Sequence, residues 1–196
     1  MRILLTGDSL LARNEGLDRP LPRIDYELNK LRPRLKIANT AVSGYNSGDL
    51  LDHYQEMIGR FTPADFDFLV IMVGTNDLAT NKQVPRQEFG AHIEQLCIQL
   101  KNQGWQAGQV CFLTPTPVDE SYQRVRSNAM VASYSELLGK LVRRAGFRLI
   151  DSFRVFLRQP DCLEILHGTR EDGLHFGGRG YQLLARLLVN ALQIED

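Results

Sequence analysis

Short runs of apolar residues alternate along the chain with longer stretches in which apolar residues recur every three or four positions. The short runs are rich in Ile, Val, Leu or Phe, which is typical of β-strands. They predict strands at residues 2–6, 35–40, 66–73, 110–113 and 147–150. The third run is apolar almost throughout, which indicates a strand that is covered on both faces.

Helical spacing fills most of the segments between these strands. It predicts helices marked by apolar positions in the ranges 24–31, 50–58, 89–100, 130–141 and 181–191. Gly104 and Gly146 follow the third and fourth of these helices as stop signals. Residues 152–170 show no clear period, and we expect a loop with a short helix there.

The alternation of strands and helices predicts an α/β fold, because helices that connect parallel strands form right-handed crossovers. We expect one domain over residues 1–196, a three-layer α/β/α sandwich around a five-stranded parallel sheet. The flavodoxin-like strand order would be 2-1-3-4-5. Such sheets bind ligands beyond the carboxyl ends of their strands, so these positions are the first place to seek chemistry.

Glycines and polar residues follow the first three predicted strands and precede the last helix. The four segments read GDSL at 7–10, VSGY at 42–45, GTND at 74–77 and DGLH at 172–175. In the expected order, the first three strands are neighbours. Their carboxyl ends should therefore bring Ser9, Gly44 and Asn76 side by side.

These residue types suit acyl transfer. A serine hydroxyl becomes an effective nucleophile when a base removes its proton, and His175 is the best candidate base for Ser9. Asp172, three residues earlier, can bind the far side of the same imidazole. The backbone amides of Ser9 and Gly44 and the side-chain amide of Asn76 could then bind an oxyanion.

The four segments resemble those of the SGNH/GDSL hydrolase family, which comprises serine esterases and lipases of three-layer α/β/α fold. They stand in the family's order and are spread over most of the chain, from residue 7 to residue 175. The resemblance implies that Ser9 is the nucleophile, that Asp172 and His175 are its acid and base, and that Ser9, Gly44 and Asn76 form the oxyanion hole. It implies hydrolysis of a carboxylic ester through an acyl-enzyme on Ser9, without a metal or an organic cofactor.

The sequence departs from the family pattern beside the chemistry. Residues 11–13 read LAR where a Thr and then a Gly are common, and Phe176 and Gly177 follow His175 where Pro-Asn is common. These changes bear on the shape of the pocket. Family members act on acetylated sugars, simple acyl esters, thioesters and lysophospholipids. The compact chain favours a small-molecule ester with a short acyl chain or an acetyl group, with thioesterase or lysophospholipase activity as the alternative.

Other residues compete for the acid and base roles. Asp77 and Asp151 follow strands, but neither has the short spacing to His175. We interpret His53 and His92 as surface residues on helices. His167 is interpreted as a loop residue near the cleft, with contact to the substrate as the alternative. Asp8 is expected to cap its turn through a side-chain hydrogen bond.

Charge and cysteine content limit the partners. Lys and Arg total 23, as do Asp and Glu, and no long basic block suggests nucleic-acid binding. No apolar run approaches the roughly 20 residues that span a bilayer, and we expect no integral membrane association. The cysteines Cys97, Cys111 and Cys162 fit neither a disulfide framework nor a metal site. We therefore expect reduced thiols that pack as small apolar residues, and a cytoplasmic protein.

Two other classes of function stay open. The same fold could serve as a non-catalytic ligand-binding module. A nucleotide or phosphate binder is disfavoured, since the loop after the first strand is poor in glycine and has no P-loop lysine. Three arginines are interpreted as surface residues, with binding of a substrate carboxylate or phosphate as the alternative: Arg13, Arg170 and Arg179.

Overall fold

The computed structural model describes residues 1–195, and its five strands form one parallel sheet in the order β2-β1-β3-β4-β5. The strands are β1 (Arg2–Gly7), β2 (Lys36–Asn39), β3 (Phe68–Met72), β4 (Val110–Leu113) and β5 (Arg148–Ile150). The predicted strands, the predicted order and the α/β fold are confirmed. The strand ends differ from the prediction by at most two residues, which is the usual uncertainty at the end of an element.

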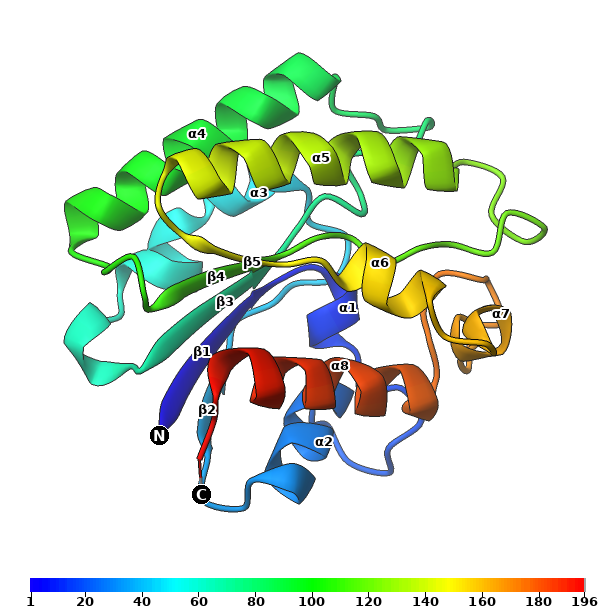
Figure 1. The fold of residues 1–196 in the computed structure, drawn as a ribbon, viewed down its shortest axis with the longest axis horizontal. Coiled ribbons are helices and arrows are strands. Elements are labelled where there is room, and N and C mark those ends of the chain that lie inside the picture. The colour runs from blue at the N-terminus through cyan, green and yellow to red at the C-terminus, as the bar shows by residue number, and fades with distance from the viewer. Residues whose placement is uncertain (196) are drawn as a thin grey trace.

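Helices cover both faces of the sheet in two layers (Figure 1). One layer holds α3 (Ser47–Asp52), α4 (Arg86–Gln103) and α5 (Asn128–Arg144). The other holds α2 (Arg23–Leu31) and α8 (Gly178–Leu192), together with the short α1 (Ser9–Ala12). No helix among residues 1–195 is both long and apolar enough to cross a membrane.

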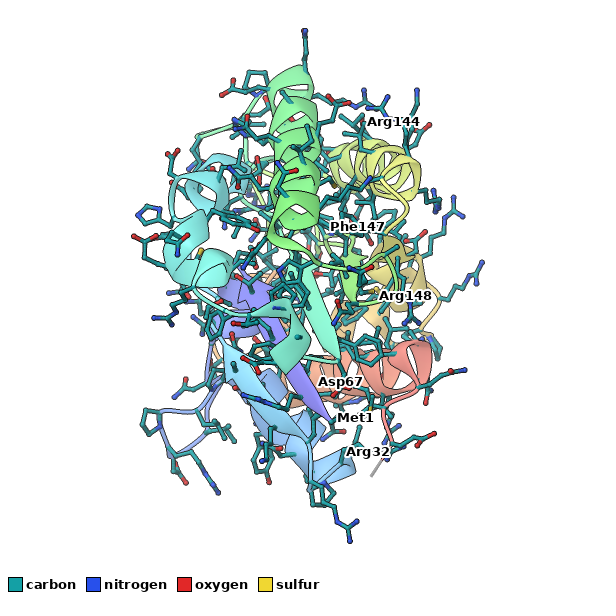
Figure 2. The ribbon with its side chains drawn as sticks, turned by 90° about the vertical axis from the view of Figure 1, so that its left-hand side faces the viewer. Met1, Arg32, Asp67, Arg144, Phe147 and Arg148 are labelled. Atoms are coloured by element: carbon teal, nitrogen blue, oxygen red, sulfur yellow. The ribbon has the colours of Figure 1, made fainter. Side chains whose placement is uncertain are left out.

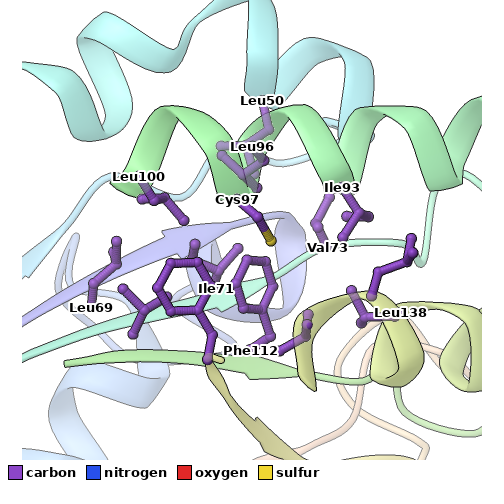
Figure 3. Close-up of a cluster of buried hydrophobic side chains, with 14 of the residues drawn as sticks. Leu50, Leu69, Ile71, Val73, Ile93, Leu96, Cys97, Leu100, Phe112 and Leu138 are labelled. Carbon is purple, nitrogen blue, oxygen red and sulfur yellow. The ribbon is translucent and has the colours of Figure 1, made fainter. Parts of the chain in front are cut away.

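Each face of the sheet builds its own hydrophobic core, because successive side chains of a strand point to opposite faces. In β3, Leu69 and Ile71 join the core beneath α4 and α5, while Val70 and Met72 join the core against α2 and α8. Figure 3 shows the first core, where Ile71 and Phe112 lie beneath the side chains of α4. Cys97 belongs to this core and Cys111 to the other, as expected of cysteines that pack as small apolar residues.

The amino ends of the strands lie opposite to the segments that carry the candidate chemistry. Figure 2 views the molecule from this side, where Met1, Asp67 and Arg148 mark the beginnings of β1, β3 and β5. The carboxylate of Asp67 accepts a hydrogen bond of 2.7 Å from the backbone N–H of Arg2. This contact ties together the starts of the two central strands.

Two helical segments differ from the prediction. The helix expected over residues 50–58 consists of α3 followed by η1 (Gln55–Gly59), a π-helical turn. The carbonyls of that turn bond elsewhere: the Thr40 hydroxyl donates to Met57 O at 2.8 Å and the Gln103 amide to Gly59 O at 3.1 Å. These tertiary bonds compensate for the regular helical bonds that the turn lacks.

Residues 152–170 hold two short helices rather than one, α6 (Ser152–Leu157) and α7 (Cys162–Ile165). Their buried apolar residues, Phe156 and Ile165, belong to the core beside α8. Elements of six and four residues are too short to show a clear helical period, so the sequence pattern alone did not separate them.

Candidate active site

The turn after β1 explains why a buried strand ends in Gly-Asp-Ser. Gly7 has φ +147°, and a Cβ added there would lie 2.0 Å from the carbonyl oxygen of Met72 on β3. Only glycine permits this approach of the two central strands. Asp8 then caps α1 by accepting the N–H of Leu10 at 2.9 Å, as predicted. Ser9 is therefore the first residue of α1 and not its cap.

Ser9, His175 and Asp172 form a continuous chain of hydrogen bonds. Ser9 Oγ lies 2.9 Å from His175 Nε2, and His175 Nδ1 lies 2.7 Å from Asp172 Oδ2. The other carboxylate oxygen of Asp172 accepts the backbone N–H groups of Leu174 and His175, at 3.1 and 2.9 Å. Since a carboxylate can only accept, the Nδ1 hydrogen of the imidazole faces Asp172, which leaves Nε2 free to accept from Ser9.

The surroundings of His175 keep its imidazole neutral near pH 7. Burial lowers its pKa below 6.5, the nearby cations Arg13 and Arg170 lower it further, and Asp172 opposes them. Burial by itself would raise the pKa of Asp172, but the hydrogen bonds from His175 and Leu174 outweigh it, and the pKa is lowered. An ionised acid thus holds a neutral base against a serine hydroxyl, which is the arrangement that nucleophilic acyl transfer requires.

Three hydrogen-bond donors from three different segments border the serine. The backbone N–H groups of Ser9 and Gly44 donate to no acceptor within residues 1–195. Asn76 Nδ2 donates one hydrogen to Tyr45 O at 2.9 Å and keeps its second hydrogen. Ser9, Gly44 and Asn76 all line one cleft of about 450 Å³, so the three predicted donors border the same space.

Arg126 orients part of this cleft. Its guanidinium donates to Thr75 O at 2.9 Å, to Asn76 Oδ1 at 3.3 Å and to Gln123 Oε1 at 3.0 Å. The amide of Gln123 in turn donates to the backbone carbonyl of Asp172. Arg126 therefore fixes which end of the Asn76 amide is the oxygen, and it links the Asn76 side of the cleft to the Asp172 side.

The rival acids are engaged away from His175. Asp77 accepts the backbone N–H of Ser47 at 3.0 Å, and burial raises its pKa. Asp151 caps α6 by accepting the N–H of Arg154 at 3.0 Å. Asp172 is consequently the acid that contacts His175.

The other histidines lie outside the cleft. His53 is exposed, as predicted, and His167 bonds Asp119 at 2.9 Å in a loop. The interpretation of His92 as a surface residue is wrong: it is half-buried, and its Nδ1 lies 2.8 Å from the hydroxyl of Ser47. Helical periodicity placed His92 off the apolar stripe but could not show that α3 packs over it.

Sequence reasoning missed several residues of the cleft. They are Asn81, Lys82, Gln123, Val125 and Arg126, and none belongs to a recognisable motif. Gln123, Val125 and Arg126 come from the segment between β4 and α5, and residues 152–170 contribute Arg170. Arg179, by contrast, pairs with Asp161 and Glu164 at the surface.

Known proteins resemble this chain in sequence and in fold. A model of the GDSL-like lipase/acylhydrolase family matches residues 5–183. The chain belongs to this family. The resemblance seen in the four sequence segments is thereby confirmed, and the match indicates an esterase-type enzyme.

Individual members of the family extend the comparison. A human protein named isoamyl acetate-hydrolyzing esterase 1 homolog is 24% identical over 202 residues, which cover 93% of this chain and 77% of that protein. A lipase/acylhydrolase from Enterococcus faecalis superposes with a TM-score of 0.82 at 21% identity, over 98% of this chain and 95% of that one. An acetylxylan esterase from Geobacillus stearothermophilus gives 0.74 at 19% identity, over 99% and 94%. The two crystal structures show the shared fold.

Proposed function

We propose that this protein is a serine carboxylic ester hydrolase that works through an acyl-enzyme on Ser9. The observation that carries the proposal is the chain from Ser9 Oγ through His175 to Asp172, with contacts of 2.9 and 2.7 Å. A serine that only capped a helix would not need this chain, and the N-cap of α1 is Asp8. The cleft beside Ser9 supplies space for a substrate.

In the proposed reaction, Ser9 Oγ attacks the ester carbonyl carbon while its proton moves to His175 Nε2. The carbonyl oxygen becomes an oxyanion that Ser9 N–H, Gly44 N–H and Asn76 Nδ2 stabilise. The tetrahedral intermediate then collapses: the bond to the alcohol oxygen breaks, and His175 returns the proton to that oxygen. Asp172 stabilises the transient imidazolium throughout.

A water molecule completes the cycle. His175 takes a proton from the water as it attacks the acyl-enzyme carbonyl, and the same three donors hold the second oxyanion. Collapse breaks the bond to Ser9 Oγ, which recovers its proton from His175, and the carboxylic acid leaves. Loss of one oxyanion donor typically lowers kcat by about 100- to 1,000-fold, so removal of the Asn76 amide should slow the reaction by about that factor.

We further propose that the acyl group is short, in the range of acetyl. The cleft of about 450 Å³ is modest. Two relatives carry names that refer to acetate esters, one to isoamyl acetate and one to acetylxylan. We also propose a cytoplasmic location, because the three cysteines form no disulfide and two of them are buried.

The test is hydrolysis of 4-nitrophenyl esters from acetate to decanoate by the wild type and by Ser9→Ala and His175→Ala. We expect turnover that is fastest for short chains and falls by at least about 1,000-fold in both variants. Ser133→Ala, a half-buried serine on α5, and His53→Ala, an exposed histidine, are matched controls outside the cleft.

Covalent labelling gives an independent measurement. A fluorophosphonate should modify the wild type at Ser9 and leave Ser9→Ala unmodified, as judged by the mass of the peptide that contains residue 9. Full activity in Ser9→Ala would exclude Ser9 as the nucleophile. A wild type that neither hydrolyses an ester nor takes up the label would instead favour a binding module.

A further inference from the structure

The cleft beside Ser9 has an excess of positive charge. Its lining holds four cationic side chains and one carboxylate: Arg13, Lys82, Arg126, Arg170 and Asp172. The carboxylate is already bound to His175. The whole chain has equal numbers of basic and acidic residues, so the positive charge of the cleft is a local feature and not the result of a high overall positive charge.

Three of the four cations have no carboxylate partner in the structure. Arg13 is compensated, since its guanidinium lies 3.2 Å from the buried carboxylate of Glu15. The hydrogen bonds of Arg126 all go to neutral acceptors, which are Thr75 O, Asn76 Oδ1 and Gln123 Oε1. Lys82 and Arg170 are exposed and form no ion pair with any residue from 1 to 195.

Such an arrangement favours an anionic ligand. Arg126 is half-buried and forms no direct ion pair within residues 1–195, and burial lowers its pKa, with Asp8 and Asp172 opposing this change. A cleft lined by charge of one sign also concentrates ligands of the opposite sign. A neutral ester would leave these charges uncompensated, whereas an ester that carries an anion would compensate them.

The position of His175 shows which part of the ester should carry the anion. In the proposed mechanism His175 protonates the leaving oxygen, so the alcohol part lies on its side of the scissile bond. Arg13 and Arg170 are the cations that act on the imidazole of His175. Arg13 is already paired with Glu15, which leaves Arg170 free on this side.

We propose that the substrate is a small ester whose alcohol part carries a carboxylate or phosphate group, which Arg170 binds while Lys82 and Arg126 add attraction. The proposal rests on the function proposed above and adds the chemical class of the substrate. A small molecule fits better than a polyanion such as nucleic acid, since the cations line one cleft of about 450 Å³. Guanidinium groups recognise carboxylate and phosphate through paired hydrogen bonds.

Matched pairs of substrates test the proposal. 4-Carboxyphenyl acetate carries a carboxylate on its alcohol part, and 4-carbamoylphenyl acetate is its neutral counterpart of nearly the same shape. 4-Acetoxyphenyl phosphate replaces the carboxylate by a phosphate. 4-Nitrophenyl esters of terephthalic acid and of its monoamide place the same contrast on the acyl part. Each enzymatic rate is divided by the rate of hydrolysis by hydroxide, which removes differences in intrinsic reactivity.

We expect kcat/KM of the wild type to be at least about tenfold higher for an alcohol-side anion than for its neutral counterpart. Arg170→Gln should lower this ratio by about 10- to 100-fold, and Lys82→Gln by less. Arg124→Gln is the matched control, because Arg124 is exposed in the same loop as Arg126 but does not line the cleft. Measurement at about pH 8.5 keeps His175 neutral in every variant.

The choice between carboxylate and phosphate comes from comparison of the two anionic acetates. A ratio near one for both anions, or a preference for the anion only on the acyl part, would overturn the proposal. So would a ratio that stays unchanged in Arg170→Gln.

Binding by Ser9→Ala separates this inference from the proposed function. Calorimetry should show 4-carboxyphenyl acetate binding at least about tenfold more tightly than 4-carbamoylphenyl acetate. Equal binding of the two probes would overturn the anion preference even if the wild type hydrolyses esters. Absence of hydrolysis of every ester by the wild type would overturn the proposed function, whatever the two probes do.

Discussion

Replacement of Asp8 by Asn should stabilise the protein, and most strongly at alkaline pH. Asp8 is completely buried. Its Oδ1 accepts the N–H of Leu10, but its Oδ2 has no hydrogen-bond partner within residues 1–195. Burial raises the pKa of Asp8 from 3.8 to about 7; Leu10 N–H, the nearby Thr75 hydroxyl and Arg126 oppose the rise, and Asp77 adds to it.

The sign follows from proton binding. Between pH 3.8 and about pH 7 the folded protein holds a proton on Asp8 that the unfolded chain has released. The contribution of Asp8 to stability is therefore fully present below pH 3.8 and is lost as pH rises toward about pH 7. The full loss is about 4 kcal/mol above pH 7, and about 1.5 kcal/mol of it is already present at pH 5.

Asparagine avoids this loss and keeps the local structure. Its side-chain oxygen still accepts the N–H of Leu10, and Asn is as good an N-cap as Asp. Its amide gains a possible acceptor in the hydroxyl of Thr75, which also has no partner within the described chain. We therefore expect Asp8→Asn to be more stable than the wild type by up to about 4 kcal/mol at pH 8.5 and by about 1.5 kcal/mol at pH 5.

Urea unfolding of both proteins at the two pH values measures the difference. Asp52→Asn makes the same chemical change at an exposed position, and its unfolding free energy should stay within about 0.5 kcal/mol of the wild type at both pH values. If Asp8→Asn gained no more at pH 8.5 than at pH 5, Asp8 would not be a buried acid of raised pKa. A variant less stable than the wild type at both pH values would refute the reasoning as well.

Three further predictions concern the turn, the base and the positioning arginine. Gly7→Ala should lower the free energy of unfolding by more than about 3 kcal/mol, because the alanine Cβ would collide with the backbone of β3. Thermal unfolding measures the change, and a variant with the Tm of the wild type would contradict the prediction. The midpoint of the acid limb of kcat/KM should lie below pH 6.5, because burial lowers the pKa of His175. Arg170→Gln should move this midpoint to higher pH, because a cation near the imidazole is lost. A pH–rate profile on a neutral ester measures the midpoint, and a shift to lower pH in the variant would contradict the prediction. Arg126→Lys should lower kcat by about tenfold with little change in KM, because lysine cannot donate to Thr75 O and Asn76 Oδ1 with the geometry of the guanidinium. Steady-state kinetics measure both constants, and a rise in KM alone would contradict a positioning role.

The sequence predicted much of the scaffold. Its apolar runs located all five strands, and the helical stripes located α2, α4, α5 and α8. The spacing at which side chains return to the same face depends only on the local backbone conformation, so these features can be recognised without tertiary information. The π-helical turn at Gln55–Gly59 escaped prediction because distant side chains, Thr40 and Gln103, bind its carbonyls.

The candidate site divides in the same way. Ser9, Gly44, Asn76, Asp172 and His175 stand in short segments at strand ends and before the last helix, where sequence pattern and fold class together bring them to one edge of the sheet. Their spacing along the chain is enough to nominate them, because the ends of parallel strands meet at a common edge.

What only the tertiary structure decided is the environment of these residues. The sequence contains Asp8, Arg126 and Arg170 as three ordinary charged side chains. Folding buries Asp8 completely, brings Arg126 against Asn76, and leaves Arg170 in the cleft without a carboxylate partner among residues 1–195. Burial and the distances between charges depend on residues far apart in the chain, so the pKa values and the charge of the cleft arise only when the layers pack together.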